Sequence, residues 1–153
     1  MSIRDQDRKM VVLLRLAAEA VLKAREKEFR KFGVSLEEWA VLFITKSVGE
    51  KTTPAEISRW MFREHHSVTA LLERMEKKGL LTKTKDLERR NMVRVTLTDK
   101  GEKIYRISRK EEVPGRILSS LSEEERQELT QHLNTLRSEA FQELGIDYKP
   151  PFP

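Results

Sequence analysis

Hydrophobic side chains recur every three or four residues along most of this chain, which predicts a mainly helical protein. The pattern first covers residues 5–31 and indicates one long helix, which Gly33 ends. A second helix begins with a capping box formed by Ser35 and Glu38, and Gly49 ends it. The first third of the chain is therefore expected to form two helices.

Two shorter helices with a tight turn between them are predicted next. Thr53 and Glu56 have the spacing of a capping box, and Pro54 suits the first helical position, so a short helix should run from Pro54 to about Met61. A turn over residues 62–65 then leads into a helix from about His66 to Lys78.

The periodicity changes to that of β-strands after this helix. Residues 80–84 and 92–97 are rich in β-type side chains, and the second run alternates between apolar and polar positions. Residues 85–91, between them, are mostly charged. The pattern predicts a two-stranded hairpin with an exposed tip.

Helical patterns return in the last third of the chain. Thr98 caps a helix over residues 99–119, which Pro114 and Gly115 should kink or interrupt. Ser122 opens a last helix that runs to about Leu144. The fold class is therefore mainly α with a small β-hairpin (α+β).

Length and composition favour one domain over residues 1–153, with an extended tail at 148–153 that has no assigned role. No apolar run approaches the roughly 18 residues of a membrane span. Residues 1–7 are polar and lack the apolar core of a secretory signal, so we expect a cytoplasmic protein. The sequence has no cysteine, which excludes disulfides, thiol nucleophiles and zinc sites built on sulfur.

Positive charge is concentrated in the middle of the chain. Residues 53–110 carry 15 Lys and Arg against 8 Asp and Glu, whereas residues 111–153 carry 4 against 9. A basic centre beside an acidic C-terminal third suggests that a polyanion-binding module is set within a scaffold of different character.

The order of elements over residues 53–98 is that of a winged helix-turn-helix, in which the second helix enters the DNA major groove. The start of that helix offers short or hydrogen-bonding side chains that suit base edges and thymine methyl groups. These candidates are His65, His66, Ser67, Thr69 and Ala70. One turn further on, Arg74 is a candidate for a phosphate contact.

The predicted hairpin, or wing, supplies long cations of the kind that enter a narrow minor groove. Arg89 and Arg90 are the candidates at its tip. Further backbone contacts are assigned to Lys83, Lys85 and Arg94 on the strands and to Arg59 and Arg63 around the turn.

Several of these residues also permit simpler interpretations. Arg89 and Arg90 could be solvated charges, and Arg74 could pair with Glu73 or Glu76. His65 and His66 could bind a metal ion, but zinc prefers three or four ligands in fixed geometry, so we expect no metal site.

An enzyme is not expected, because the sequence has no glycine-rich phosphate loop, nucleophile elbow or HExxH motif. We expect no cofactor. The remaining rival is a winged-helix module that binds proteins and never contacts DNA.

Three stretches of the chain resemble the MarR family of regulators, named for multiple antibiotic resistance. Residues 67–81 end in Glu-Arg-Met-Glu-Lys-Lys-Gly-Leu-Leu, residues 86–90 read Asp-Leu-Glu-Arg-Arg, and residues 93–101 contain Val-Thr-Leu-Thr-Asp-Lys-Gly. Family members typically show a helix ending R-L-E-K-K-G-L-V, a wing rich in Asp and Arg, and a V-x-L-T-x-x-G exit. The three motifs recur here in order and at compatible spacing.

The wing departs from the usual family pattern, Asp-x-x-Asp-Arg-Arg. Arg89 occupies the second Asp position and Asn91 the last Arg position. The wing-tip arginine of the family therefore maps to Arg90, with Arg89 an additional contact.

The resemblance implies a homodimer that binds a pseudo-palindromic DNA operator, usually as a repressor. It assigns residues 34–98 to the DNA-binding lobe and residues 1–33 and 99–147 to dimerisation helices. It also implies a small aromatic or anionic effector between these regions. We place that effector near Phe29, Trp39, Phe43, Trp60 and Met61, although for Trp39 and Trp60 a place in the hydrophobic core is the favoured interpretation.

Overall fold

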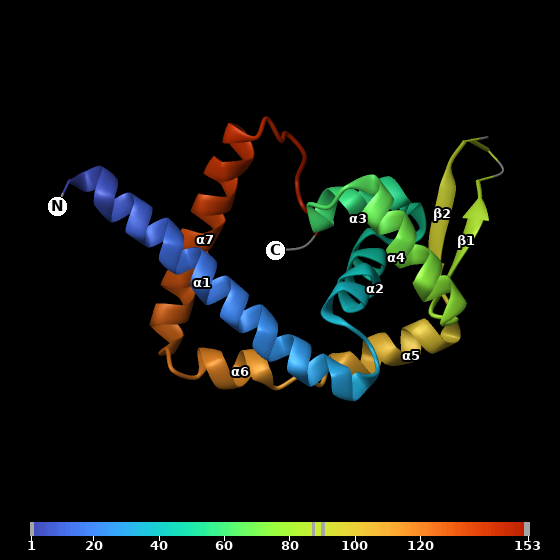
Figure 1. Ribbon diagram of the computed structural model, residues 1–153, viewed down its shortest axis with the longest axis horizontal. Coiled ribbons are helices and arrows are strands. Elements are labelled where there is room, and N and C mark those ends of the chain that lie inside the picture. Colours follow the sequence, from blue (N-terminus) through green and yellow to red (C-terminus); the bar gives the residue numbers. More distant parts are fainter. Residues whose placement is uncertain (1, 87, 90, 152–153) are drawn as a thin grey trace. The chain divides into compact units, whose positions relative to one another are not determined.

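The computed structural model describes residues 2–86, 88–89 and 91–151 (Figure 1). The chain divides into two compact units, Met1–Glu111 and Glu112–Pro153. The first unit holds two long helices, a helix-turn-helix, a hairpin and a further helix. The second unit holds the last two helices.

The first helix, α1, spans Ile3–Phe29 and continues as a short 3-10 turn, η1, over Arg30–Phe32. It starts two residues earlier than the sequence pattern predicts, because Ser2 forms a capping box with Asp5. Gly33 ends the segment in the left-handed conformation, with φ of 80°. This ending was predicted.

Helix α2, Leu36–Val48, begins with the predicted capping box between Ser35 and Glu38. Glu38 is also buried and accepts a hydrogen bond of 2.6 Å from Nζ of Lys78, at the end of α4. A 3-10 turn, η2, follows over Gly49–Lys51. One carboxylate thus caps α2 and ties it to the helix-turn-helix.

The helix-turn-helix consists of α3, Pro54–Met61, and α4, His65–Lys77. The side chain of Thr53 caps α3 as predicted, but the carboxylate of Glu56 accepts hydrogen bonds from Arg59 and Trp60, one turn further along the same helix. Phe62 ends α3 with φ of 52°, the left-handed region that non-glycine residues seldom adopt. This sharp bend lets α4 begin only three residues later.

The hairpin, or wing, pairs β1, Leu81–Lys85, with β2, Val93–Leu97, in antiparallel register. On its inner side, the backbone N–H of Val95 donates to the carbonyl of Thr52 at 2.9 Å. The wing is therefore attached to the segment that precedes α3.

The hydrophobic core of the first unit lies around α2, which packs against α1, α3 and α5 (Figure 1). Its largest fully buried side chains come from five elements or their flanking residues. They are Phe29, Leu42, Ile57, Leu72, Met75, Leu80 and Leu81. The core fixes α4 and the wing as parts of one lobe.

Helix α5, Asp99–Ser108, starts at Thr98, whose hydroxyl accepts from the N–H of Gly101 at 3.1 Å and donates to the carbonyl of Gly79 at 2.5 Å. A methyl group at Gly101 would collide with the carbonyl oxygen of Leu80. The wing exit is therefore closely packed against the end of α4.

The second unit contains α6, Val113–Leu118, and α7, Glu123–Glu143. The helix predicted over 99–119 is interrupted, as expected, but the break lies at residues 109–112, before Pro114, which lies in the first turn of α6. Proline is tolerated in the first turn of a helix, where its missing N–H would have no partner within the helix, so α6 begins next to Pro114 rather than continuing α5. The capping box at Ser122 was predicted and is present.

The order of elements confirms the predicted fold class, mainly α with a small hairpin wing after a helix-turn-helix. Among the residues that the structure describes, no helix is both long enough and apolar enough to cross a membrane.

Candidate nucleic-acid interface

The start of α4 presents small and hydrogen-bonding side chains to the outside. His65, His66, Ser67 and Ala70 are all exposed, and we call them the reading face. The opposite side of the helix is buried in the core through Val68, Leu71, Leu72 and Met75. The amphipathic pattern thus leaves these four predicted residues accessible to a partner.

Thr69 and Arg74 complete the predicted set on α4 but differ in their surroundings. The hydroxyl of Thr69 donates to the carbonyl of His65 at 3.0 Å, and the side chain is half-buried. Arg74 is exposed, and no carboxylate of the described chain lies within ion-pair distance of it. The alternative pairing of Arg74 with Glu73 or Glu76 was therefore wrong.

Arg59 and Arg63, the predicted backbone contacts around the turn, each have a carboxylate partner. Arg59 lies 3.0 Å from Glu56, one turn back on α3, and its side chain is 40% exposed. Arg63 pairs with Glu37 at the start of α2. To contact phosphates, both guanidinium groups would have to share or leave these partners.

The wing tip contains Arg89, which is exposed and contacts the sulfur of Met92 through Nη1 at 3.6 Å. Lys85, at the end of β1, is also exposed. Arg90, the predicted wing-tip arginine, lies outside the described residues.

Arg94 on β2, a predicted backbone contact, is bound within the wing. Its Nε and Nη2 donate to one carboxylate oxygen of Asp86 at 3.1 and 2.8 Å. The other oxygen accepts the backbone N–H of Glu88 at 2.9 Å. The Glu88 N–H and the Arg94 guanidinium lower the pKa of Asp86 below its ordinary value of 3.8. These contacts fold the start of the wing tip back onto β2.

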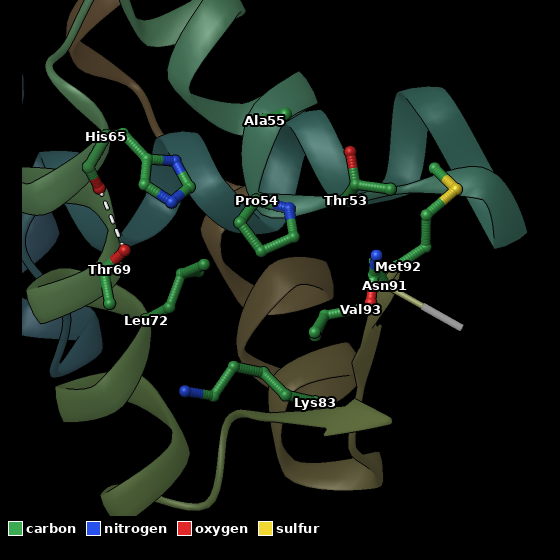
Figure 2. Close-up of a pocket in the computed structure, with 10 residues that line it drawn as sticks. All are labelled: Thr53, Pro54, Ala55, His65, Thr69, Leu72, Lys83, Asn91, Met92 and Val93. Carbon is green, nitrogen blue, oxygen red and sulfur yellow. Dashed lines mark hydrogen bonds between the residues drawn. The ribbon is translucent and has the colours of Figure 1, made fainter. Parts of the chain in front are cut away.

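Lys83, the remaining wing candidate, lines a groove of about 380 Å³ between α4, the start of α3 and the wing. Figure 2 shows its side chain reaching across the groove toward α4. His65 and Thr69 line the same groove from α4, and Asn91 and Met92 line it from the wing. The structure thus brings Lys83 together with part of the predicted recognition helix.

Three of the five predicted effector residues form a row of aromatic rings. Ring centroids of Phe29 and Trp39 are 5.2 Å apart, and Trp39 stacks on Phe43 at 5.2 Å. Phe29 is fully buried, while Trp39 and Phe43 are half-buried. Trp60 and Met61 lie at the end of α3, where Nε1 of Trp60 donates to Glu56 at 3.0 Å.

The sequence pattern missed a charged pair beside this aromatic row. The guanidinium of Arg25 lies 4.5 Å from the ring centre of Trp39 and makes two hydrogen bonds of 3.0 Å with Glu111. Both side chains are only 17% exposed. The one local signal was the position of Arg25 four residues before Phe29, on the same side of α1.

Comparison with known proteins identifies relatives of this lobe. The model of the MarR family matches residues 32–90. The HTH-type transcriptional regulator SarZ of Staphylococcus saprophyticus is 24% identical over 98 residues, which cover 64% of this chain and 66% of SarZ. The chain therefore spans slightly less than two thirds of that relative.

Solved structures resemble a larger part of the chain. The organohalide-sensing transcriptional regulator RdhR, in its 2,4-dichlorophenol-bound form, matches with 30% identity and a TM-score of 0.77 over 88% of this chain and 80% of that one. A MarR variant from Escherichia coli in complex with operator DNA matches with a TM-score of 0.79 and 15% identity, over 89% and 99% of the two chains. At that identity, the second likeness shows the fold.

Proposed function

The chain belongs to the MarR family of DNA-binding transcriptional regulators, and from this premise we propose that it is a repressor that binds a pseudo-palindromic operator as a homodimer. The observation that carries the proposal is the reading face of α4, exposed beside an arginine-containing wing on one compact lobe. Binding to chromosomal DNA would place it in the cytoplasm of a bacterium or archaeon.

Each DNA contact has a distinct role in the proposal. Ser67 and the two histidines of the reading face would contact base edges, where hydrogen bonds distinguish sequences. Arg89 and Arg74 would contact the minor groove or phosphates, as would Arg90, which we include from the sequence alone. Lys83 and Arg94 have carboxylate partners within the lobe, so we rank them below these residues.

The homodimer is supported by apolar side chains that are exposed in the single chain. On α1, Val11, Leu13 and Leu16 are 66%, 67% and 52% exposed. On α7, Leu133 and Leu136 are 43% and 47% exposed. Helices with this much exposed apolar surface need a partner, because large apolar patches on a monomer mark interaction sites.

Selection of bound fragments from random duplex DNA tests the function directly. We expect recovery of a two-fold symmetric site whose half-sites lie about 10 bp apart, since two recognition helices of a dimer enter successive major grooves. The affinity should fall steeply between about 50 and 200 mM salt, with a slope near −0.9 per neutralised phosphate. Replacing Arg89 and Arg90 together with alanine should reduce that slope and weaken all duplexes alike.

The rival function is a winged-helix module that binds a protein. It predicts no enrichment of any duplex and no salt-dependent DNA binding. The outcome of the selection therefore decides between the two functions with the wild-type protein alone.

We further propose that a small aromatic compound acts as effector at the row formed by Phe29, Trp39 and Phe43. The regulator RdhR, 30% identical to this chain, binds 2,4-dichlorophenol, so chlorinated phenols are the first compounds to test. Half-buried stacked rings offer a flat apolar wall for such a ligand.

Tryptophan fluorescence tests the effector proposal. In a Trp60→Phe variant, Trp39 is the only remaining tryptophan of the chain. We expect 2,4-dichlorophenol to quench its emission with saturation and to weaken operator binding over the same concentrations. Quenching without loss of operator binding would show that the compound binds but does not act as an effector.

A further inference from the structure

We propose that Glu76 is a positioning residue that fixes the wing relative to the recognition helix, so that both can engage one duplex. This inference rests on the proposed DNA-binding function. The carboxylate lies on α4, near the end of the helix, and it contacts β1 rather than its own helix.

Two contacts join Glu76 to the wing. Its Oε2 accepts the backbone N–H of Lys83 at 3.0 Å, and its Oε1 lies 3.8 Å from Nζ of the same residue. The side chains of Glu76 and Lys83 are 41% and 25% exposed. The backbone N–H and the side-chain ammonium of Lys83 therefore both contact the Glu76 carboxylate of the recognition helix.

The strand register shows why this N–H matters. Lys83 lies opposite Val95, in a pair between the hydrogen-bonded pairs of the hairpin, so its N–H points to the free edge of β1. The Glu76 carboxylate occupies that edge position. It holds β1 against α4, whereas β2 is held on its other side by the Val95 N–H bond to Thr52.

The contact also sets the direction of the Lys83 side chain. Its ammonium group is drawn toward α4 and across the groove that separates the wing from the recognition helix (Figure 2). An acidic residue near a DNA-binding face would by itself repel phosphates. The contact offsets this repulsion, because a wing that Glu76 already holds in place loses less conformational entropy on binding DNA than a wing that rotates freely.

Operator binding by three single variants separates positioning from charge. Glu76→Ala removes the hydrogen bond and should weaken binding about five- to tenfold, whereas Glu76→Gln keeps an acceptor oxygen and should stay within about twofold of wild type. Glu73→Ala is the matched control. It removes the same charge from an exposed position of α4 that has no ion pair in the described chain. It should not weaken binding.

A double-mutant cycle tests whether Glu76 acts through the wing. In an Arg89→Ala/Arg90→Ala background the wing tip makes no cationic contact, so adding Glu76→Ala should change affinity by less than about twofold. An equal loss in both backgrounds would overturn the proposal, because Glu76 would then act on the recognition helix itself. A gain in affinity for Glu76→Ala would also overturn it, since simple repulsion would explain the residue.

Hydrogen exchange of the Lys83 amide gives a readout that does not depend on DNA. We expect exchange to accelerate by about tenfold or more in Glu76→Ala and to stay slow in Glu76→Gln. Unchanged exchange in Glu76→Ala would overturn the proposal. If the wild-type protein binds no duplex while this amide behaves as expected, the DNA-binding function fails and the helix-to-wing contact stands.

Discussion

At the scale of single residues, the wing exit is tightly packed around Gly101. Gly101 lies against the carbonyl of Leu80 so closely that it has no room for a side chain. Thr98 bonds to both Gly79 and Gly101 at the same corner. The glycine of the V-x-L-T-x-x-G motif is therefore explained by close approach of the backbone rather than by an unusual φ.

We predict that Gly101→Ala destabilises the protein by about 1–3 kcal/mol or more, because overpacking displaces the backbone of two elements. Gly115→Ala in α6 is the control, since a methyl group there meets no atom of the described chain within 4 Å. Alanine is the better helix former, so this variant should match or exceed the wild type by up to about 1 kcal/mol. Urea unfolding measures both, and equal stability of the two variants would contradict the packing argument.

Asp86 supports a second residue-scale prediction, on the pH dependence of stability. Its pKa is lowered in the folded protein, so its stabilising contribution is complete above the ordinary value of 3.8 and is lost as pH falls through the folded value. Asp86→Asn removes the charge. The difference in unfolding free energy between wild type and Asp86→Asn should be constant at neutral pH and shrink in acid, below about pH 4. A difference that does not change from pH 7 to pH 2 would contradict the assigned contacts.

At the scale of elements, the helix caps were readable from the sequence because they are local. The boxes at Ser35 and Ser122 each join residues three apart, and both are formed as expected. The start of α1 was missed because Ser2 and Asp5 precede the apolar pattern used to place it. The predicted reading face is exposed because the period of the apolar residues also determines which side of α4 is buried.

The contacts between elements could not be predicted in the same way. Arg25 and Glu111 lie 86 positions apart, and Glu38 and Lys78 lie 40 apart, so no local pattern pairs them. For the same reason, the prediction that Lys83 and Arg94 contact the DNA backbone did not anticipate their carboxylate partners. Charge type is visible in a sequence, whereas the partner of a charge depends on the fold.

Helix α4 and the wing should respond differently to substitution. Ser67→Ala on the reading face should alter the discrimination between base pairs at one position of each half-site, by about 1–3 kcal/mol of binding free energy. Arg89→Ala at the wing should weaken preferred and random duplexes by a similar factor. Competition assays measure both effects: each variant binds the operator in the presence of competitor duplexes that each carry a single base change. If Ser67→Ala keeps the wild-type ranking of these duplexes, α4 is not oriented with this face toward the bases.

At the scale of the whole molecule, the distribution of charge and apolar surface separates two tasks. Residues 53–110 concentrate the positive charge and contain the helix-turn-helix and the wing. Residues 111–153 are acidic and belong almost entirely to the second unit. Most of the exposed large apolar side chains lie instead on α1, α6 and α7, with Phe62 in the turn before α4 the main exception. The proposed function therefore assigns DNA contact and self-association to different surfaces, and predicts that each can be changed without the other.

Disrupting the apolar surface of α1 tests the dimer at this scale. Val11 and Leu14 are 66% and 43% exposed and lie three residues apart, on one side of the helix. Because glutamate at both positions places charge in an apolar interface, we expect Val11→Glu/Leu14→Glu to sediment as a monomer. Its near-UV circular dichroism should remain that of a folded lobe, since neither side chain belongs to the buried core.

The DNA affinity of this variant completes the prediction. A dimer holds its second lobe at high effective concentration near the second half-site, which can strengthen binding by about 10²–10⁴-fold over one lobe. The monomeric variant should therefore have the same affinity for the full operator as for a duplex with one half-site. The wild type should bind the full operator much more tightly than the half-site duplex. Lys23→Glu is the control, because it alters an exposed charge of α1 without removing apolar surface, and it should remain dimeric. A folded double variant that still sediments as a dimer would show that this side of α1 does not form the interface, whatever the DNA affinity.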